Sequence, residues 1–351
     1  MISAGEASGD VLGAGLVEAI RSLEAHEFVG LVGPHMEAQK VSAIAHTEEL
    51  GVMGIVEVLG SLPRIRKVLK RMEDALDGVD LLVAIDSPDF NLRLAEKATK
   101  RGIPVVLLGS PQVWAWRSGR AKVIAEGVQE VICLFPFEPE YYTEHGGTAI
   151  CIGHPSAAAL NPLKREGDGL ALVPGSRKQE LTRLLPTMIR VASAWRESRP
   201  QASVTLARAP GLPEHCFEPV PDWIEMRPTL SEALAPASVV LACSGTASLE
   251  IACLDRPQVV LYRMNPLTYV LAKPFLKKGQ QIALPNLLAD AQVSEFLQTL
   301  PEKQILEALV DAETSAQQES GRVAVRNAVT GGGFTEAAER CLFWLRKAQT
   351  G

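Results

Sequence analysis

The sequence predicts an α/β protein built from two doubly wound halves in series. Short apolar runs rich in β-branched residues alternate with longer amphipathic segments along the whole chain. This alternation is typical of parallel sheets that are covered by helices on both faces. It stops after Gly153-His154-Pro155 and restarts at Gly169, and the 351 residues of the chain exceed the roughly 250–300 that one hydrophobic core usually supports. We therefore expect two domains.

The first half is predicted to span residues 1–160. Amphipathic patterns with helical spacing lie between its apolar runs, for example at residues 10–23 and 91–101. A weakly polar stretch, residues 161–168, is predicted to link this half to the next. The candidate strands are residues 28–32, 81–85, 104–108, 130–134 and 149–152.

The second half is predicted to span residues 161–333. The charge-free stretch at residues 233–249 contains Pro236 and Gly245, so it predicts a buried strand and a turn rather than a membrane-spanning helix. The last helix, residues 334–351, is amphipathic, and we expect it to pack on the first half or on a neighbouring copy, which would make a homodimer. The candidate strands are residues 169–173, 202–207, 239–242 and 258–262.

The composition excludes several classes of protein. Hydrophobic residues make up 47% and charged residues 22%, which excludes a disordered or fibrous chain. The net charge of −6 argues against nucleic acid as a partner, because a nucleic-acid binder carries a basic field. The six cysteines form no Cys-x-x-Cys pair and no signal peptide follows Met1, so we expect reduced thiols in a cytoplasmic protein with at most peripheral membrane contact. The absence of Asp-x-Asp and His-x-x-x-His motifs predicts no metal, and we expect no cofactor.

Polar or glycine-rich turns after the strands are the candidate sites, because open parallel sheets bind ligands beyond the carboxyl ends of their strands. The first such turn, residues 5–10, reads Gly-Glu-Ala-Ser-Gly-Asp. Its glycines would let the backbone approach a ligand, and the next helix could hold an anion or sugar hydroxyls at its N-terminus. The alternative is a simple capped turn in which Ser8 or Asp10 caps that helix.

Asp86 follows the most apolar strand of the first half, in the turn Asp86-Ser87-Pro88-Asp89-Phe90-Asn91. A carboxylate at the end of a strand, with a pKa open to tuning by burial, suits a general base. The alternative is a structural N-cap, and Asp89 could cap the same helix.

Two further turns have polar or aromatic character. Trp114 and Trp116 precede Arg117. Their rings could stack on sugars or acyl chains, and the guanidinium could pair with a phosphate. The alternative is that the segment is a hydrophobic plug under a loop. Asn286 is the only hydrogen-bonding side chain in the apolar run Leu284–Leu288. It could touch a nucleotide or sugar, or it could cap a helix.

Two turns of the second half suit a diphosphate. The first is Pro174-Gly175-Ser176-Arg177, in which Gly175 and Ser176 offer backbone and hydroxyl donors and Arg177 offers a planar guanidinium fork for a diphosphate. This turn is neither a Walker loop nor a dinucleotide fingerprint. The run Ser244–Glu250 reads Ser-Gly-Thr-Ala-Ser-Leu-Glu and opens a helix. The first N–H groups of that helix could stabilise a leaving diphosphate, and Glu250 could accept from ribose hydroxyls.

Together and in this order, these turns resemble those of the lipid-A-disaccharide synthases. The resemblance is collinear and covers nearly the whole chain, so the series is specific although each motif alone is weak. The family usually has several more residues before the first motif, so we expect either a very short first strand or a truncated start. The matching motifs are Gly5–Ala14, Val52–Leu59, Asp86–Asn91, Val113–Arg117, Phe135–Glu138, Gly153-His154, Pro174–Arg177, Ser244–Glu250 and Leu284–Leu288.

The resemblance implies an inverting, metal-independent glycosyltransferase of the GT-B type, with two Rossmann-like domains facing a cleft. In the family's reaction, UDP-2,3-diacylglucosamine and 2,3-diacylglucosamine 1-phosphate (lipid X) give the β-1,6-linked lipid A disaccharide 1-phosphate and UDP. Asp86 is implied as the general base, and whether Glu6, Asp89 or His154 share the proton transfer stays open. The implied UDP- or donor-binding residues are Gly175, Ser176, Arg177, Ser244, Gly245, Thr246, Glu250 and Asn286. The implied residues on the acceptor side of the cleft are Glu6, Ser8, Gly9, Trp114 and Arg117.

The segment at residues 52–72 predicts contact with the inner-membrane surface. It combines apolar and basic residues in an otherwise acidic chain, a pattern that favours binding to anionic bilayers, and the resemblance implies acylated substrates. The alternative is an ordinary amphipathic helix packed on its own sheet. The apolar residues predicted to face the membrane are Val56, Val58, Leu59, Leu62 and Ile65.

Two other functions fit parts of the sequence. Another GT-B enzyme, such as a UDP-N-acetylglucosamine 2-epimerase, would need the nucleotide-binding half but would leave the segment at residues 52–72 unexplained. A non-catalytic protein that binds a UDP-sugar or a lipid would bind UDP without turnover.

Overall fold

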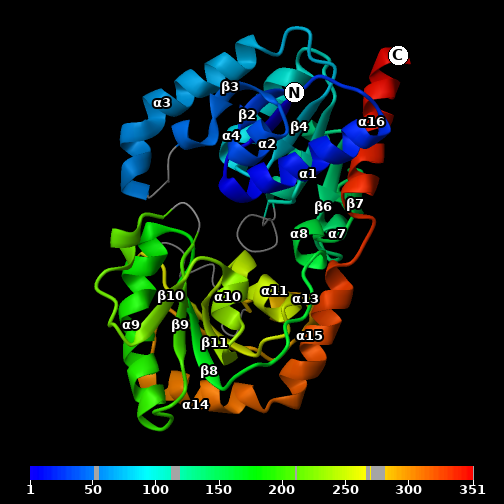
Figure 1. The fold of residues 1–351 in the computed structure, drawn as a ribbon. Coiled ribbons are helices and arrows are strands. Elements are labelled where there is room, and N and C mark those ends of the chain that lie inside the picture. Colours follow the sequence, from blue (N-terminus) through cyan, green and yellow to red (C-terminus); the bar gives the residue numbers. More distant parts are fainter. Residues whose placement is uncertain (51–54, 112–118, 210–211, 266–268, 270–280, 351) are drawn as a thin grey trace. The chain divides into compact units, whose positions relative to one another are not determined.

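The computed structural model describes residues 1–50, 55–111, 119–209, 212–265, 269 and 281–350 (Figure 1). The chain forms two compact units, which we describe one at a time. Unit 1 comprises Met1–Ser156 and Val329–Gly351, and unit 2 comprises Ala157–Ala328. The chain therefore enters unit 2 before the predicted linker at residues 161–168, and that stretch packs on unit 2, where the buried Arg256 donates to the carbonyls of Leu163 and Lys164.

Unit 1 contains a seven-stranded parallel sheet with the strand order β3-β2-β1-β4-β5-β6-β7. The central strands are buried on both faces, and alternate residues point to opposite faces; Val83 and Ile85 join one core, whereas Leu82 and Ala84 join the cores of the other face. The strands are β1 (Ile2–Ala4), β2 (Val29–Val32), β3 (Ser42–His46), β4 (Leu82–Ile85), β5 (Val105–Leu108), β6 (Glu130–Cys133) and β7 (Ala149–Cys151).

Helices cover both faces of this sheet. Helices α1 and α16 pack on one face together with α2, and α3, α4, α6 and α7 pack on the other. A short 3-10 helix, Thr47–Glu49, follows β3. The helices are α1 (Ala7–Leu23), α2 (Pro34–Ala38), α3 (Ile55–Asp74), α4 (Pro88–Thr99), α6 (Gly119–Gly127), α7 (Pro139–Thr143), α8 (Pro155–Ala158) and α16 (Gly333–Thr350).

The C-terminal helix α16 lies along α1 in unit 1 (Figure 1). Its buried residues Ala337, Ala338, Cys341 and Leu342 belong to the core between α1 and the sheet. One ion pair also anchors it: Glu130 of β6 is fully buried and accepts from the Arg340 guanidinium and from Trp344 Nε1 of α16.

Unit 2 contains a six-stranded parallel sheet with the strand order β10-β9-β8-β11-β12-β13. Helices α9 and α14 pack on one face, and α10 and α11 on the other. The strands are β8 (Gly169–Val173), β9 (Val204–Ala207), β10 (Ile224–Arg227), β11 (Ala237–Cys243), β12 (Gln258–Tyr262) and β13 (Ser294–Leu297). The helices are α9 (Lys178–Glu197), α10 (Leu230–Leu234), α11 (Thr246–Cys253), α13 (Leu284–Ala289), α14 (Glu302–Glu313) and α15 (Ala316–Val329), with a 3-10 helix at Glu214–Phe217.

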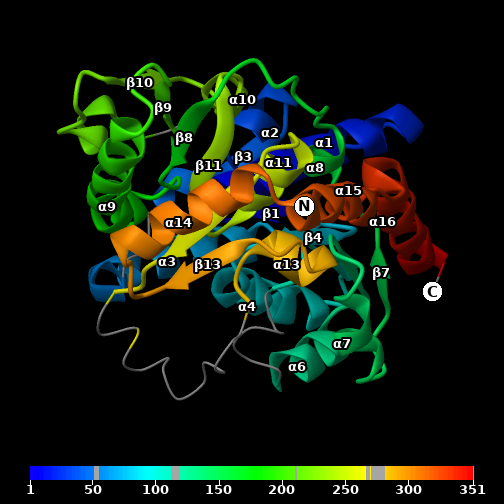
Figure 2. The ribbon, with the colours of Figure 1, turned by 90° about the horizontal axis from the view of Figure 1, so that it is seen from below.

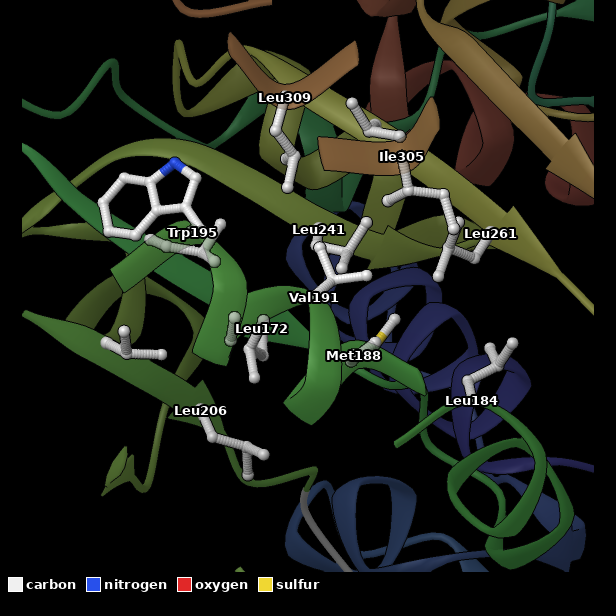
Figure 3. Close-up of a cluster of buried hydrophobic side chains, with 14 of the residues drawn as sticks. Leu172, Leu184, Met188, Val191, Trp195, Leu206, Leu241, Leu261, Ile305 and Leu309 are labelled. Carbon is white, nitrogen blue, oxygen red and sulfur yellow. The ribbon is translucent and has the colours of Figure 1, made fainter. Parts of the chain in front are cut away.

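The main core of unit 2 follows directly from the helical period of α9. Leu184, Met188, Val191 and Trp195 recur every three or four residues, so they lie on one side of the helix and point at the sheet (Figure 3). They meet Leu172, Leu206, Leu241 and Leu261 from four strands, with Ile305 and Leu309 from α14 alongside. Helix α14 lies beside α9 (Figure 2), so the two helices close this face together.

These two parallel sheets confirm the predicted fold class. All nine predicted strands are present. A first strand, β1, is also present and has only three residues, as one of the two alternatives for the start of the chain expected. No strand was predicted at β3, β10 and β13, which lie at sheet edges and contain half-buried or exposed residues, so they lack the continuous apolar pattern of a central strand. None of the described helices combines the length and the apolar character that crossing a bilayer requires.

Candidate functional site

Each sheet has a point where the order of its strands reverses, and the candidate turns lie there. In unit 1 the adjacent strands β1 and β4 pair Ala4 with Ile85, and the turns that carry Glu6 and Asp86 follow directly. In unit 2 the adjacent strands β8 and β11 pair Leu172 with Leu241, before the turns at residues 174–177 and 244–245. Because crossovers leave in opposite directions from such a pair, a crevice opens at the carboxyl ends of its strands.

Asp86 adopts an unusual backbone conformation. Its φ is +51° and that of Ser87 is +42°, so two successive residues other than glycine occupy the left-handed region. Each such residue costs on the order of 1–3 kcal/mol, and such strain concentrates at functional sites. The conformation ends β4 abruptly and leaves the half-buried Asp86 side chain beside the β1–α1 turn, where the Ser8 hydroxyl donates to Oδ2 at 3.1 Å.

Two glycines lie next to this carboxylate. A Cβ built on Gly9 would lie 3.2 Å from Asp86 Oδ2, which is a tight contact. Gly109 has a φ of +81°, which disfavours any other residue, whereas a Cβ there would lie at an ordinary contact distance of 3.4 Å from Oδ1. Gly9 therefore lets the Asp86 side chain come close, a role that its position near the start of a helix did not reveal.

Asn91 holds the strained turn in place, a role that the sequence pattern did not predict. Its buried side-chain amide lies 2.7 Å from the Ile85 carbonyl and 2.8 Å from the Asp86 carbonyl, and its Oδ1 accepts from Ser3 Oγ at 2.6 Å. The signal was available: Asn91 shares the buried face of α4 with Leu94, Ala95 and Ala98, and a buried amide needs hydrogen-bond partners.

Asp10 does not cap α1, so this predicted role is wrong. Helix α1 begins at Ala7, after Glu6, and has no side-chain cap. Asp10 is buried and accepts instead from the backbone N–H groups of Gly33, His35 and Met36, at 2.8 to 3.1 Å. It therefore caps α2. This segment lies so far along the chain from Asp10 that the sequence pattern could not indicate the contact.

The other titratable groups in the turns of unit 1 differ in their exposure. Asp89 is exposed and forms an ion pair with Arg120; it lies in the first turn of α4, and the N-cap position is Ser87. His154 is only 7% exposed, its ring stacks on that of Phe135, and burial lowers its pKa. Trp114 and Arg117 lie outside the described residues.

In unit 2, the turn after β8 is organised by Glu180. Its carboxylate accepts from the backbone N–H groups of Ser176 and Arg177, at 3.1 and 3.3 Å, and pairs with the Arg177 guanidinium. Gly175 has a φ of +108°, and a Cβ there would lie 2.3 Å from Glu180 Oε2. The Arg177 side chain is 57% exposed.

The turn after β11 presents backbone donors. Gly245 precedes α11 without a side-chain cap, and Gly245 and Thr246 are exposed. Ser244 points away from this helix end, because its hydroxyl donates to the Ile282 carbonyl at 3.0 Å. An uncapped helix start carries N–H groups and a positive partial charge, and both favour an anion.

Glu250 lies on α11 one turn after these donors. It is half-buried, and its carboxylate has no hydrogen-bond partner among the described residues. Burial raises the pKa of this carboxyl. An acid that loses its hydration without gaining a partner is suited to accept hydrogen bonds from a ligand.

Glu250→Gln is expected to make the protein more stable and to weaken the predicted binding of UDP. Because the pKa of the Glu250 carboxyl is raised in the folded protein, the stability of the protein falls as pH rises from the ordinary glutamate pKa through the folded pKa. At pH 7 the uncharged glutamine amide therefore removes the unfavourable free energy of burying a charged carboxylate. Loss of a charged acceptor should weaken UDP binding about tenfold or more. Calorimetric melting at pH 7 and at pH 4, together with UDP titration, measures both effects.

The matched control is Glu307→Gln, which changes an exposed carboxylate of α14 and should alter neither property. A melting temperature of Glu250→Gln below that of the wild type at pH 7 would contradict the expectation, as would a stability gain that persists at pH 4.

Asn286 is fixed within unit 2. Its Nδ2 donates to the Val293 carbonyl at 2.8 Å and to Glu295 Oε1 at 2.5 Å, and its Oδ1 accepts from the Val293 N–H at 2.8 Å. These bonds tie α13 to the start of β13. A direct contact between Asn286 and a nucleotide stays a prediction.

The family model for lipid-A-disaccharide synthetase matches residues 1–338. The chain is 40% identical over 321 residues to a lipid-A-disaccharide synthase of Alkalilimnicola ehrlichii, which covers 84% of each protein. It is 38% identical over 363 residues to that of Pseudomonas aeruginosa, which covers 97% of this chain and 96% of the relative.

Solved structures show the same fold at low identity. The glycosyltransferase of kitacinnamycin matches with a TM-score of 0.65 and 16% identity, covering 98% of both chains. The UDP-GlcNAc 2-epimerase of Neisseria meningitidis matches with a TM-score of 0.66 and 12% identity, covering 99% of this chain and 98% of that one. Whole-chain matches to the family model and to relatives of 38–40% identity show that this chain belongs to the lipid-A-disaccharide synthase family and has the GT-B fold of glycosyltransferases.

Proposed function

We propose that this protein transfers a diacylglucosamine residue from UDP to lipid X, with Asp86 as the general base. Asp86 takes the proton from the acceptor 6-hydroxyl while that oxygen forms a bond to C1 of UDP-2,3-diacylglucosamine. The bond between C1 and the diphosphate oxygen breaks, and UDP leaves. A single displacement of this kind inverts the anomeric centre and gives the β-1,6-linked disaccharide 1-phosphate.

The observation that carries this proposal is the geometry of Asp86. Its carboxylate lies at the strand-order reversal of unit 1 in a strained turn that Asn91 holds, with Gly9 close beside it. The N-cap of α4 is Ser87, so the strained conformation of Asp86 does not serve to cap the helix. The Ser8 hydroxyl, at 3.1 Å from Oδ2, orients one carboxylate oxygen.

The leaving diphosphate would be held by unit 2. Arg177 offers a guanidinium fork, and Gly245 and Thr246 offer backbone N–H groups at the start of α11. Such donors stabilise developing negative charge without a metal. Glu180 orients this turn, because its carboxylate already accepts from the N–H groups of Ser176 and Arg177. The carboxylate of Glu250 would accept hydrogen bonds from the ribose hydroxyls.

Release of UDP from the acylated donor tests the proposal. We expect release only when the acylated acceptor is present, with formation of the disaccharide 1-phosphate. Conversion of unacylated UDP-N-acetylglucosamine would indicate an epimerase instead. Binding of UDP with no turnover of any acylated pair would indicate a non-catalytic binding protein.

We also propose that α3 touches the membrane surface. In its second half, Ile65, Val68, Leu69 and Met72 pack on the core of unit 1, so Ile65 belongs to the inward face rather than to the predicted membrane face. The side chains at positions 64, 66, 67 and 70 are exposed and basic, which supports contact with anionic lipids. The side chains of Val56, Val58 and Leu59 lie outside the described residues.

The triple variant Val58→Ser, Leu59→Ser and Leu62→Ser is expected to lose vesicle binding, because these residues would supply the apolar part of the contact. Flotation with phosphatidylglycerol vesicles measures it, and Val123→Ser, an exposed apolar residue of α6, serves as control. Unchanged flotation and unchanged detergent-free solubility would refute the membrane contact.

A further inference from the structure

A groove in unit 2 carries three arginines that the proposed reaction does not use. It has a volume of about 390 Å³ and is lined by the first half of α9 and by the two residues that follow β12. Arg183 and Arg190 come from α9 and Arg263 from the segment after β12, and they are accompanied by two threonines, a proline and a methionine. None of the described residues that line it is acidic.

The arginines on α9 are held in position by neighbours. Arg190 donates to Thr187 Oγ1 at 3.1 Å and to Glu302 of α14 at 2.6 Å, and the Thr187 side chain is itself buried. Arg183 donates through one nitrogen to Gln179 at 3.0 Å. Arg263 is exposed and forms no ion pair within the part of the chain that the structure describes. Each guanidinium has five N–H donors, so donors remain for a ligand.

The charge of the groove is opposite to that of the protein. The groove contains three guanidinium groups, of which Arg190 pairs with Glu302, whereas the whole chain carries a net charge of −6. Like charges that are brought together without compensation repel one another, and a concave surface of one sign attracts a ligand of the other sign. The planar fork of arginine matches the oxygens of a phosphate group better than any other side chain does.

The groove consists of residues other than those of the diphosphate turns. It shares α9 with the turn at Arg177 but begins beyond the first helical turn, and Arg263 follows β12, the strand next to β11. We propose that this groove binds a phosphate group, as a phosphomonoester or phosphodiester, separately from the donor's diphosphate. The phosphate belongs either to a phospholipid headgroup or to a soluble compound, and the experiment separates these sources.

The test uses the full chain with arginine labelled by nitrogen-15 and with UDP at saturation, so that the donor site is filled. Inorganic phosphate is titrated while the side-chain Nε–Hε signals are recorded. We expect the Arg183 and Arg263 signals to shift, and the double variant Arg183→Gln and Arg263→Gln to weaken phosphate binding about tenfold or more, because each lost bond is charge-assisted. Arg208→Gln, which changes another arginine of unit 2 outside the groove, is the control, and thermal melting verifies folding.

Flotation with phosphatidylcholine vesicles, with and without phosphatidylglycerol, forms the second arm. If the double variant weakens both phosphate binding and flotation on the anionic vesicles, the ligand is a phospholipid headgroup. If only phosphate binding weakens, the ligand is a soluble phosphate compound. If phosphate shifts neither signal, or the double variant behaves like Arg208→Gln, the proposal is wrong, whatever the protein does with UDP-sugars.

Discussion

Asp86→Asn is expected to lower the turnover of the acylated donor and acceptor about 10²–10⁴-fold, the usual contribution of a general base. The asparagine amide has the shape of the carboxylate but cannot take a proton at neutral pH. Asparagine also tolerates a positive φ as aspartate does, so the strained turn at Asp86 and Ser87 should persist. The measurement is the initial rate of UDP release, with melting temperature and UDP affinity as companions.

Asp89→Asn provides the matched control three residues away. It changes an exposed carboxylate of the same turn that pairs with Arg120, and we expect less than a few-fold loss of rate. If both variants lose the same rate, or if Asp86→Asn keeps full activity, Asp86 is not the base. If UDP affinity and rate fall together in Asp86→Asn, the aspartate acts in binding instead.

Glu130→Ala is expected to destabilise unit 1 by about 3 kcal/mol, because the fully buried carboxylate accepts from both Trp344 Nε1 and the partly exposed Arg340 guanidinium. Without Glu130, Arg340 and Trp344 of α16 lose the carboxylate that accepts hydrogen bonds from both. The melting temperature of the unit should fall by roughly 6–12 °C, given its length. Limited proteolysis should then cut α16 faster than in the wild type.

The control for this effect is Arg346→Gln on the same helix. Arg346 pairs with Glu24, the residue that follows α1, but its side chain is 63% exposed, and exposed pairs contribute about 0–1 kcal/mol. Equal destabilisation by the two variants would mean that burial of Glu130 is not what anchors α16.

The central strands were predictable because their apolar runs are long enough to be buried on both faces. β4, β5, β8 and β11 each contain at least four consecutive buried residues. The edge strands were not predictable, because a strand at an exposed edge does not need a continuous apolar run. Two of them, Ser42–His46 and Ile224–Arg227, mix polar and apolar residues. Their place in the sheet follows from neighbours rather than from their own residues.

Several residues of the candidate site were also predictable by position. Asp86, Arg177 and Glu250 follow strands or open helices, so topology alone places them at the carboxyl edges of their sheets. Their partners were not predictable, because a hydrogen bond between distant segments leaves no local pattern. Asp10 caps a helix more than twenty residues away, and Ser8 reaches Asp86 across 78 positions of the chain.

Local sequence by itself therefore determined the two-unit α/β architecture, the family and the turns that carry polar groups, because hydrophobic periodicity and motif order act over short stretches. Only the tertiary structure decided which polar groups meet: the carboxylate of Asp86 beside Gly9, the three bonds that fix Asn286, and the arginines of α9 beside Arg263. These encounters depend on how strands from different parts of the chain pair, and that pairing is a property of the packed sheet and not of any one segment.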